Sequence, residues 1–121
     1  MKAIAVYGSL KKGFYNHSLL IGVSDYLGEG VESGFQLYSL GSYPCAVKTG
    51  NPEDKIRVEY YLVDEGTFQR LDRMERAAGY YQEDLGDRGI LWVFGLKPSD
   101  QPPIPPGSDG VASWGGFTQW S

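Results

Sequence analysis

Residues 56–76 read IRVEYYLVDEGTFQRLDRMER, and this stretch decides the fold because a strand pattern passes directly into a helix pattern. In its first half, apolar residues alternate with charged ones, which predicts a β-strand over residues 56–63. Asp64 can then accept hydrogen bonds from the first free amides of a helix. We therefore expect the main helix to begin near Asp64 and to end at residues 77–79, which read Ala-Ala-Gly.

Glu75 departs from the pattern of this helix. At 100° per residue, Phe68, Leu71 and Met74 form the apolar face, and Glu75 falls between Phe68 and Leu71 in the same arc. A buried carboxylate must gain hydrogen bonds or a cation, or hold a proton at unusually high pH. A carboxyl group of the last kind can act as a general acid/base. The position also suits a glutamate that is hydrogen-bonded to a nearby tyrosine at the helix end, and the helix pattern alone favours neither interpretation.

Size and charge restrict the class of protein. With 121 residues the chain is long enough for one domain with its own core and too short for a second full domain. Its net charge is −4, and no cationic cluster is longer than the Lys11-Lys12 pair. We therefore expect no binding to nucleic acid or to an anionic membrane, and a small-molecule partner instead. Nothing in the sequence indicates an oligomeric state.

The cysteine and histidine counts bear on metals and on the cellular compartment. Cys45 is the single cysteine and His17 the single histidine, so an internal disulfide and a zinc site of the usual His/Cys kind are both excluded. The apolar run at residues 1–7 stops at Gly8, before it reaches the length of a signal-peptide core or of a membrane span. We therefore expect a cytoplasmic protein without a metal.

The other segments indicate mostly short strands. Residues 2–7 predict a buried strand that enters a glycine-bounded loop. Over residues 26–47, short apolar runs are broken by four glycines before a proline, which predicts brief strands with sharp corners in a small barrel or a strongly curved sheet. Residues 80–85 and 90–97 predict two strands joined by a hairpin-type connection over 86–89. Strands then outnumber helices.

The composition changes near the C-terminus. Residues 98–121 are rich in proline and glycine, and no regular element fits them. We therefore expect a domain over residues 1–97 and a tail over residues 98–121. The tail keeps three large aromatic residues: Trp114, Phe117 and Trp120. Because a purely solvated linker would not favour such side chains, the tail either packs back on the domain or awaits a partner.

Two motifs carry a resemblance to a known family. Residues 6–17 read VYGSLKKGFYNH, and residues 71–75 read LDRME, with Tyr81 six residues after the glutamate. In order and spacing the chain resembles the γ-glutamylcyclotransferase-like (AIG2-like) family, and within it the γ-glutamylamine cyclotransferases most of all. The resemblance covers roughly residues 2–97 and excludes the tail. It also takes in three further segments: Tyr43-Pro44, residues 58–65 and residues 92–94.

This resemblance implies an α+β fold, with a small mixed β-barrel flanked by a few helices. It also implies a cavity lined by the loop at residues 7–10 and a catalytic glutamate that matches Glu75. The residues expected to bind substrate are Tyr7, Gly8, Ser9, Leu10 and Tyr81. Tyr7 equally suits a core aromatic residue, and Tyr81 equally suits simple packing. We expect His17 and Asn16 to anchor the loop and to cap a turn rather than to contact substrate.

The implied chemistry explains why no convincing nucleophile is present. In a γ-glutamyl compound, the α-amine can attack the γ-carbonyl carbon and close the five-membered lactam of 5-oxoproline. The enzyme must hold the glutamyl chain folded, remove an amine proton and return a proton to the leaving amine. One carboxyl group with a raised pKa can perform both transfers, and loop amides can bind the α-carboxylate or the developing oxyanion. We therefore expect a cyclotransferase that needs no cofactor.

Two positions depart from the family pattern. Arg76 follows the glutamate where glycine is common, and Glu83 replaces an arginine that is commonly found two residues past the tyrosine. These changes leave the identity of the leaving amine open. They also leave open an alternative function, in which the chain is a non-catalytic module that binds a small ligand in the same cavity.

Overall fold

The structure is a computed structural model, and it describes residues 1–8, 10, 11, 15–41, 43–98 and 102–115. In chain order its strands are β1 (Lys2–Val6), β2 (Ser24–Ser33), β3 (Phe35–Ser39), β4 (Pro44–Lys48), β5 (Lys55–Val63), β6 (Tyr81–Asp84) and β7 (Ile90–Val93). The helices are α1 (Glu65–Ala77) and two 3₁₀ helices, η1 (Tyr15–Leu19) and η2 (Gly86–Arg88). Within these described ranges, no helix combines the length and the apolar character needed to cross a bilayer.

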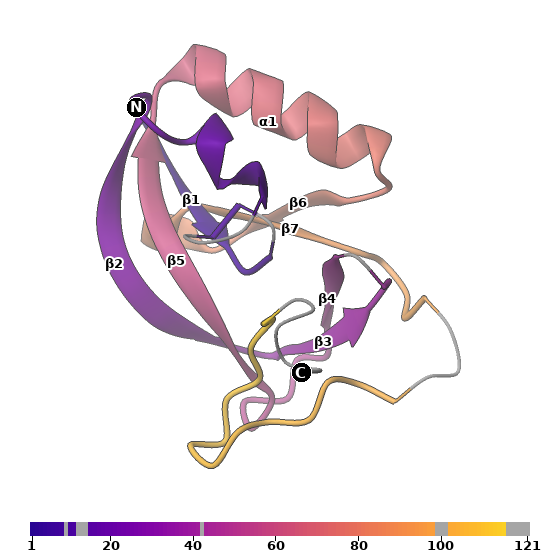
Figure 1. Ribbon diagram of the computed structural model, residues 1–121. Coiled ribbons are helices and arrows are strands. Elements are labelled where there is room, and N and C mark those ends of the chain that lie inside the picture. The colour runs from indigo at the N-terminus through magenta and orange to yellow at the C-terminus, as the bar shows by residue number, and fades with distance from the viewer. Residues whose placement is uncertain (9, 12–14, 42, 99–101, 116–121) are drawn as a thin grey trace.

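Five strands form a mixed sheet in the order β2-β5-β1-β7-β6, and β3 and β4 form a separate two-stranded sheet. All neighbours are antiparallel except β1 and β7. Figure 1 shows β2 and β5 curving together toward β3 and β4, with α1 across the opposite end of the molecule. The α+β fold class is therefore confirmed.

The expected barrel does not close in the described part of the chain. β2 and β6 are the two outer strands of the five-stranded sheet. The contact between β4 and the chain after β7 is a single parallel bridge, Val47 to Phe94, with the Phe94 N–H donating to the Ala46 carbonyl at 2.9 Å. β6 and β7 are only four residues long, so they offer little backbone to extend this ladder. The result is a strongly curved open sheet.

The main helix forms where the capping residue predicted it. Asp64 is its N-cap, and the Asp64 carboxylate accepts from the Thr67 N–H at 2.7 Å. At the other end, the Tyr80 N–H donates to the Glu75 carbonyl at 3.0 Å, and the Gly79 N–H donates to the Arg76 carbonyl at 3.1 Å. Together with the positive φ of Gly79, these bonds make a Schellman motif that turns the chain back over the last helical turn.

The prediction of brief strands over residues 26–47 was wrong for β2, which runs unbroken for ten residues. The register against β5 shifts between Tyr26 and Gly28, where Gly28 has φ +126°, so this glycine makes a bulge and bends the strand. Gly30 gives room to the Tyr60 ring, since a Cβ there would lie 2.4 Å from Tyr60 Cε2. These glycines curve the strand instead of ending it.

The core occupies both faces of the sheet. Alternate residues of β1 point to opposite sides, with Ile4 and Val6 joining Phe68 and Leu71 of α1 in one cluster. Ala5 belongs to the other cluster, which contains residues of β3, β5 and β7. α1 is therefore held on the sheet by its apolar face, and that packing fixes the direction in which its other side chains point.

The described part of residues 98–121 packs back on the strands that precede it. The Ala112 N–H donates to the Lys55 carbonyl, and the Ala112 carbonyl accepts from the Arg57 N–H, both at 2.9 Å. The Ile104 N–H donates to the Leu37 carbonyl at 2.7 Å. Trp114 is buried, as we expected for a tail that returns to the body. Phe117 and Trp120 lie outside the described residues.

Candidate active site

A cavity of about 240 Å³ opens beside the end of β1, between the C-terminal half of α1 and the chain that enters β4. Its walls come from four regions of the chain that lie far apart in the sequence. The lining residues are Ala5, Val6, Tyr7, Gly8, Leu10, Tyr43, Pro44, Met74, Glu75, Ala78, Tyr80 and Trp92. The structure thus brings Glu75 together with three of the predicted substrate-binding residues.

Of the other two predicted residues, the structure describes Tyr81 alone. Ser9 lies outside the described residues. Tyr81 is 42% exposed and is not part of the cavity wall. Tyr80 lines the cavity instead, because the Schellman motif folds the residue after Gly79 back toward Glu75. The signal that could have found Tyr80 was Gly79 itself, since a glycine just past a helix commonly precedes such a reversal.

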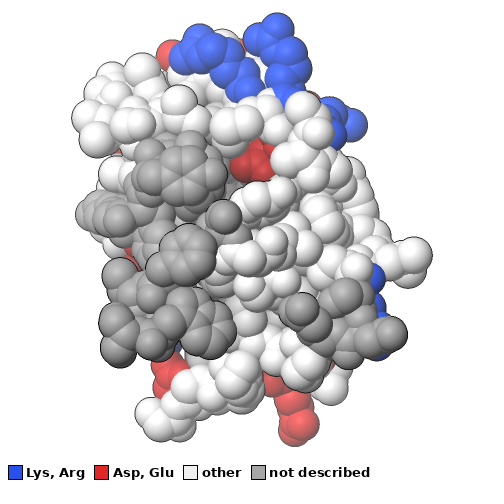
Figure 2. Space-filling model, turned by 45° about the vertical axis from the view of Figure 1, so that its right-hand side comes forward, with Lys and Arg blue, Asp and Glu red and all other residues white. Residues whose placement is uncertain are grey.

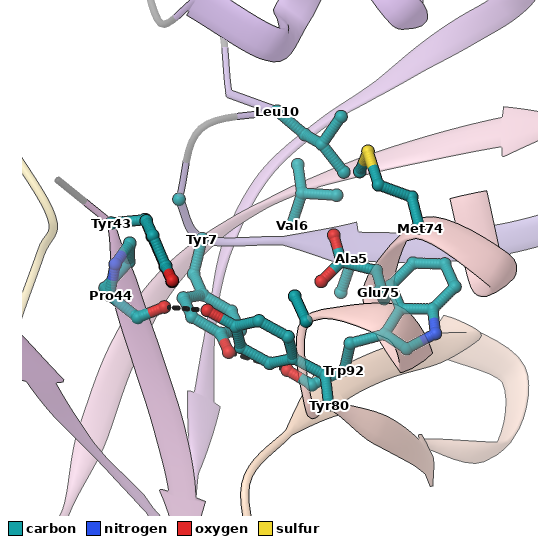
Figure 3. A pocket seen from close by; sticks show the side chains of 12 residues that line it. Ala5, Val6, Tyr7, Leu10, Tyr43, Pro44, Met74, Glu75, Tyr80 and Trp92 are labelled. Carbon is teal, nitrogen blue, oxygen red and sulfur yellow. Dashed lines mark hydrogen bonds between the residues drawn. The ribbon is translucent and has the colours of Figure 1, made fainter. Parts of the chain in front are cut away.

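Glu75 points its carboxyl group into the cavity (Figure 3). The side chain is partly buried, and no described residue donates a hydrogen bond to its carboxyl group. Burial raises the pKa of Glu75 from 4.5 to about 7, and the nearby negative charge of Asp72 acts in the same direction. A carboxyl group with this pKa is populated both as acid and as base at neutral pH.

Tyr7 serves both the core and the cavity wall. Its hydroxyl donates to the Trp92 carbonyl at 2.6 Å and accepts from the Ala46 N–H at 2.9 Å. Burial raises the pKa of Tyr7, and the neighbouring Tyr80 adds to that rise. The phenol therefore stays neutral and is committed to the backbone of β4 and β7. It ties these strands to the loop that follows β1.

Tyr80 closes the neighbouring part of the wall. Its hydroxyl donates to the Pro44 carbonyl at 2.6 Å, and its ring packs against Phe94 with the ring centroids 4.7 Å apart. Figure 3 shows the hydroxyls of Tyr7 and Tyr80 bonded to backbone carbonyls, and the carboxyl group of Glu75 bonded to neither hydroxyl. The tyrosine-bonded alternative for Glu75 therefore finds no support among the described residues.

The loop after β1 is held close to the cavity. A Cβ on Gly8 would lie 2.9 Å from two carbons of the Pro44 ring, so glycine permits this approach. The Lys11 N–H donates to the Gly8 carbonyl at 3.0 Å, and His17 Nδ1 bonds to the Leu10 carbonyl at 2.8 Å. The predicted anchoring role of His17 is confirmed, whereas the Asn16 side chain lies outside what the structure describes.

The cavity wall carries a single charged group among its described residues, the carboxyl group of Glu75. Among the described residues, Figure 2 shows mostly uncharged atoms in the middle of this face, with cationic side chains along its upper edge, one recessed acidic spot below them and further acidic side chains at its lower edge. Arg76 Nε donates to Asp72 at 2.8 Å, and Glu83 accepts from Lys48 at 2.8 Å, both outside the cavity wall. In the described ranges, no group of three or more His, Cys, Asp or Glu side chains could hold a metal.

Known proteins share this fold and much of this sequence. Residues 4–109 match the family model described as gamma-glutamyl cyclotransferase, AIG2-like. A Pyrococcus horikoshii protein named "Putative gamma-glutamylcyclotransferase" is 40% identical over 98 residues, 78% of this chain and 80% of that protein. The gamma-glutamylcyclotransferase family protein YtfP of Escherichia coli K12 is 37% identical over 93 residues, 75% of this chain and 79% of its own length.

A crystal structure of a P. horikoshii protein titled as uncharacterized agrees with this fold. It matches with a TM-score of 0.72 and 39% identity, and the match covers 86% of each chain. The residues matched by the family model include the loop after β1, the helix α1 and the strands that together build the cavity. By sequence and by fold, the chain belongs to the gamma-glutamyl cyclotransferase, AIG2-like family.

Proposed function

We propose that this protein converts a γ-glutamyl amine, or a related γ-glutamyl conjugate, into 5-oxoproline and the free amine, with Glu75 as general acid/base and without a cofactor. The observation that carries the proposal is the carboxyl group of Glu75, which faces a cavity whose other described lining residues are uncharged. A pKa of about 7 lets this group accept and return a proton at neutral pH.

The reaction needs two proton transfers and no covalent bond between the protein and the substrate. The substrate's α-amine nitrogen attacks the γ-carbonyl carbon, and Glu75 takes a proton from that nitrogen. As the tetrahedral intermediate collapses, the bond between the carbonyl carbon and the leaving nitrogen breaks, and Glu75 returns the proton to that nitrogen. The attack is intramolecular, so holding the glutamyl chain folded lowers the barrier by raising the effective concentration of the amine.

The loop after β1 is the proposed binding site for the glutamyl group. Gly8 and Leu10 line the cavity, and their backbone N–H groups donate to no other described residue. Such amides can bind the substrate's α-carboxylate or the oxyanion that develops on the γ-carbonyl oxygen. Tyr7 contributes its ring to the wall, and Tyr80 takes the place near Glu75 that the sequence had suggested for Tyr81.

The wall favours an amine over an acidic leaving group. A leaving group that carries a carboxylate would need a cation to pair with it, and no lysine or arginine is among the described residues of the wall. An uncharged or cationic amine is compatible with the aromatic and aliphatic side chains of Tyr43, Met74 and Tyr80. This supports the γ-glutamylamine type of substrate within the family.

The test is turnover of a panel of γ-glutamyl amines, with 5-oxoproline and the released amine both detected by mass. The wild type is expected to form the two products in equal amounts. Glu75→Gln keeps the volume of the side chain but removes the proton transfer, so a rate loss on the order of 10² to 10⁴ is expected. Tight binding without turnover across the panel would favour the non-catalytic binding module instead.

A further inference from the structure

Asp72 lies one helical turn before Glu75 and is buried, with 9% of its surface exposed. Its carboxylate accepts three hydrogen bonds from three different elements. On one oxygen, Trp92 Nε1 of β7 and Gln82 Nε2 of β6 both donate at 2.9 Å. On the other oxygen, Arg76 Nε of α1 donates at 2.8 Å. This carboxylate therefore joins α1 to the sheet at the level of the cavity.

We propose that Asp72 is a positioning residue for Glu75: it fixes the helical turn that carries Glu75 against the cavity wall and stands as a permanent negative charge beside it. Residues three apart on a helix are neighbours on its surface, with about 5–6 Å between their Cβ atoms. The role in catalysis rests on the proposed function, whereas the electrostatic role does not.

The hydrogen bonds of Asp72 account for its permanent charge. Burial alone would raise the pKa of Asp72, but the bonds from Trp92, Gln82 and Arg76 together hold it below its usual range. Asp72 therefore stays ionised at the pH where Glu75 exchanges its proton. A fixed negative charge at this distance disfavours ionisation of Glu75, and this acts together with the burial of Glu75.

Trp92 links Asp72 to the wall of the cavity. Its indole N–H is held by Asp72, its ring lines the cavity, and its carbonyl accepts the Tyr7 hydroxyl at 2.6 Å. A rotation of α1 away from β7 would break the first of these bonds and would shift Glu75 relative to the wall. The arrangement explains why a helix should place a second carboxylate so close to the proposed acid/base.

The other titratable groups near Glu75 do not replace this charge. Arg76 lies on the same helix and is paired with Asp72. From the facing elements come Tyr7, Tyr43 and Tyr80 in the cavity wall, and Cys45 is buried in β4. Burial raises the pKa of Tyr7 and of Cys45, so both are neutral at pH 7. Among the described groups that face Glu75, Asp72 is the permanent anion.

The experiment is a titration of the Glu75 carboxyl carbon by ¹³C NMR, with the Glu75 signal assigned from its loss in Glu75→Gln. Asp72→Asn keeps an oxygen to accept from Trp92 and Gln82 but removes the charge. At an effective dielectric constant between that of a protein surface and water, this should lower the Glu75 titration midpoint by roughly one pH unit. Asp84→Asn, at an exposed acid of β6, is the matched control and should leave the midpoint unchanged.

Arg76→Gln supplies a second test that does not alter Asp72. It removes the cation that partly offsets the Asp72 charge, so the Glu75 midpoint should stay the same or rise. Adding Asp72→Asn to this variant should lower the midpoint below that of Arg76→Gln alone. The proposal would be overturned if Asp72→Asn left the Glu75 midpoint unchanged. It would also be overturned if Asp84→Asn lowered the midpoint as much as Asp72→Asn does.

The pH profile separates this proposal from the function. If the protein cyclises γ-glutamyl amines, the ascending limb of kcat/KM should move to lower pH in Asp72→Asn by the same amount as the midpoint. A shifted NMR midpoint in a protein without turnover would support the role of Asp72 and count against the proposed function alone. Turnover with an unshifted NMR midpoint would support the proposed function and count against the role of Asp72.

Discussion

Replacing Glu75 by glutamine should make the folded protein more stable at pH 8 while slowing the proposed cyclisation. In the wild type, burial raises the pKa of Glu75 from 4.5 to about 7. The folded state therefore binds this proton more tightly than the unfolded state does. The stabilisation from proton binding is complete below about pH 4.5, falls as the pH rises, and is lost above about pH 7. The glutamine side chain does not titrate in this pH range, so its contribution to stability stays constant.

The size of this effect follows from the two pKa values. A difference of about 2.5 between 4.5 and about 7 corresponds to about 3 kcal/mol of unfolding free energy, at about 1.4 kcal/mol for each pKa unit. The glutamine variant and the wild type should thus be nearly equal in stability at pH 4, where the carboxyl group is protonated in both states. At pH 8 the variant should be more stable by about 3 kcal/mol.

The assay is urea unfolding at 25 °C from pH 4 to pH 8.5, with the free energy of unfolding extrapolated to water for both proteins. Only the difference between them is used, so other titrating groups cancel. Glu53→Gln, at an exposed carboxylate, controls for the loss of one negative charge. A stability difference between Glu75→Gln and wild type that stays constant over this pH range would refute the argument.

Three further substitutions test the geometry around the cavity. Gly8→Ala places a Cβ 2.9 Å from the Pro44 ring, so the loop must shift and kcat/KM in the cyclisation assay should fall roughly tenfold to a hundredfold. Gly79→Ala forces alanine to φ +98° in the Schellman motif and should lower the unfolding free energy by about 1 kcal/mol or more in urea titrations. Tyr7→Phe leaves a buried N–H and a buried carbonyl without their partner and should cost about 1–3 kcal/mol in the same titrations, with the cavity volume little changed.

The sequence was sufficient for the main helix and its unusual glutamate. The capping residue Asp64 and the apolar spacing fix the start and the facing side of α1, and a carboxylate inside the apolar arc is visible by counting alone. The strand over residues 56–63 was equally clear in its position, which matches β5. Its alternation holds only as far as Val58, because Glu59 and Tyr61 are buried whereas Tyr60 is half-buried. These features depend on neighbours within a few residues, so local rules describe them.

Features that depend on contacts between distant segments were not visible. The wall that faces Glu75 is completed by Pro44 and Trp92, and only the curvature of the sheet brings them to α1. The glycines of β2 looked like strand ends because the sequence does not show that Tyr60 fills the space beside Gly30. The buried bonds of Asp72 to β6 and β7 likewise join residues at least ten positions apart.

The pH dependence of kcat/KM for a γ-glutamyl amine tests the central claim most directly. If the Glu75 carboxyl group accepts the amine proton, the wild-type rate should rise with pH along a limb centred near 7, and this limb should be missing in Glu75→Gln, where only the ionisation of the substrate amine remains. A wild-type profile that is flat from pH 5 to 8, or a limb near 7 that persists in Glu75→Gln, would contradict the account.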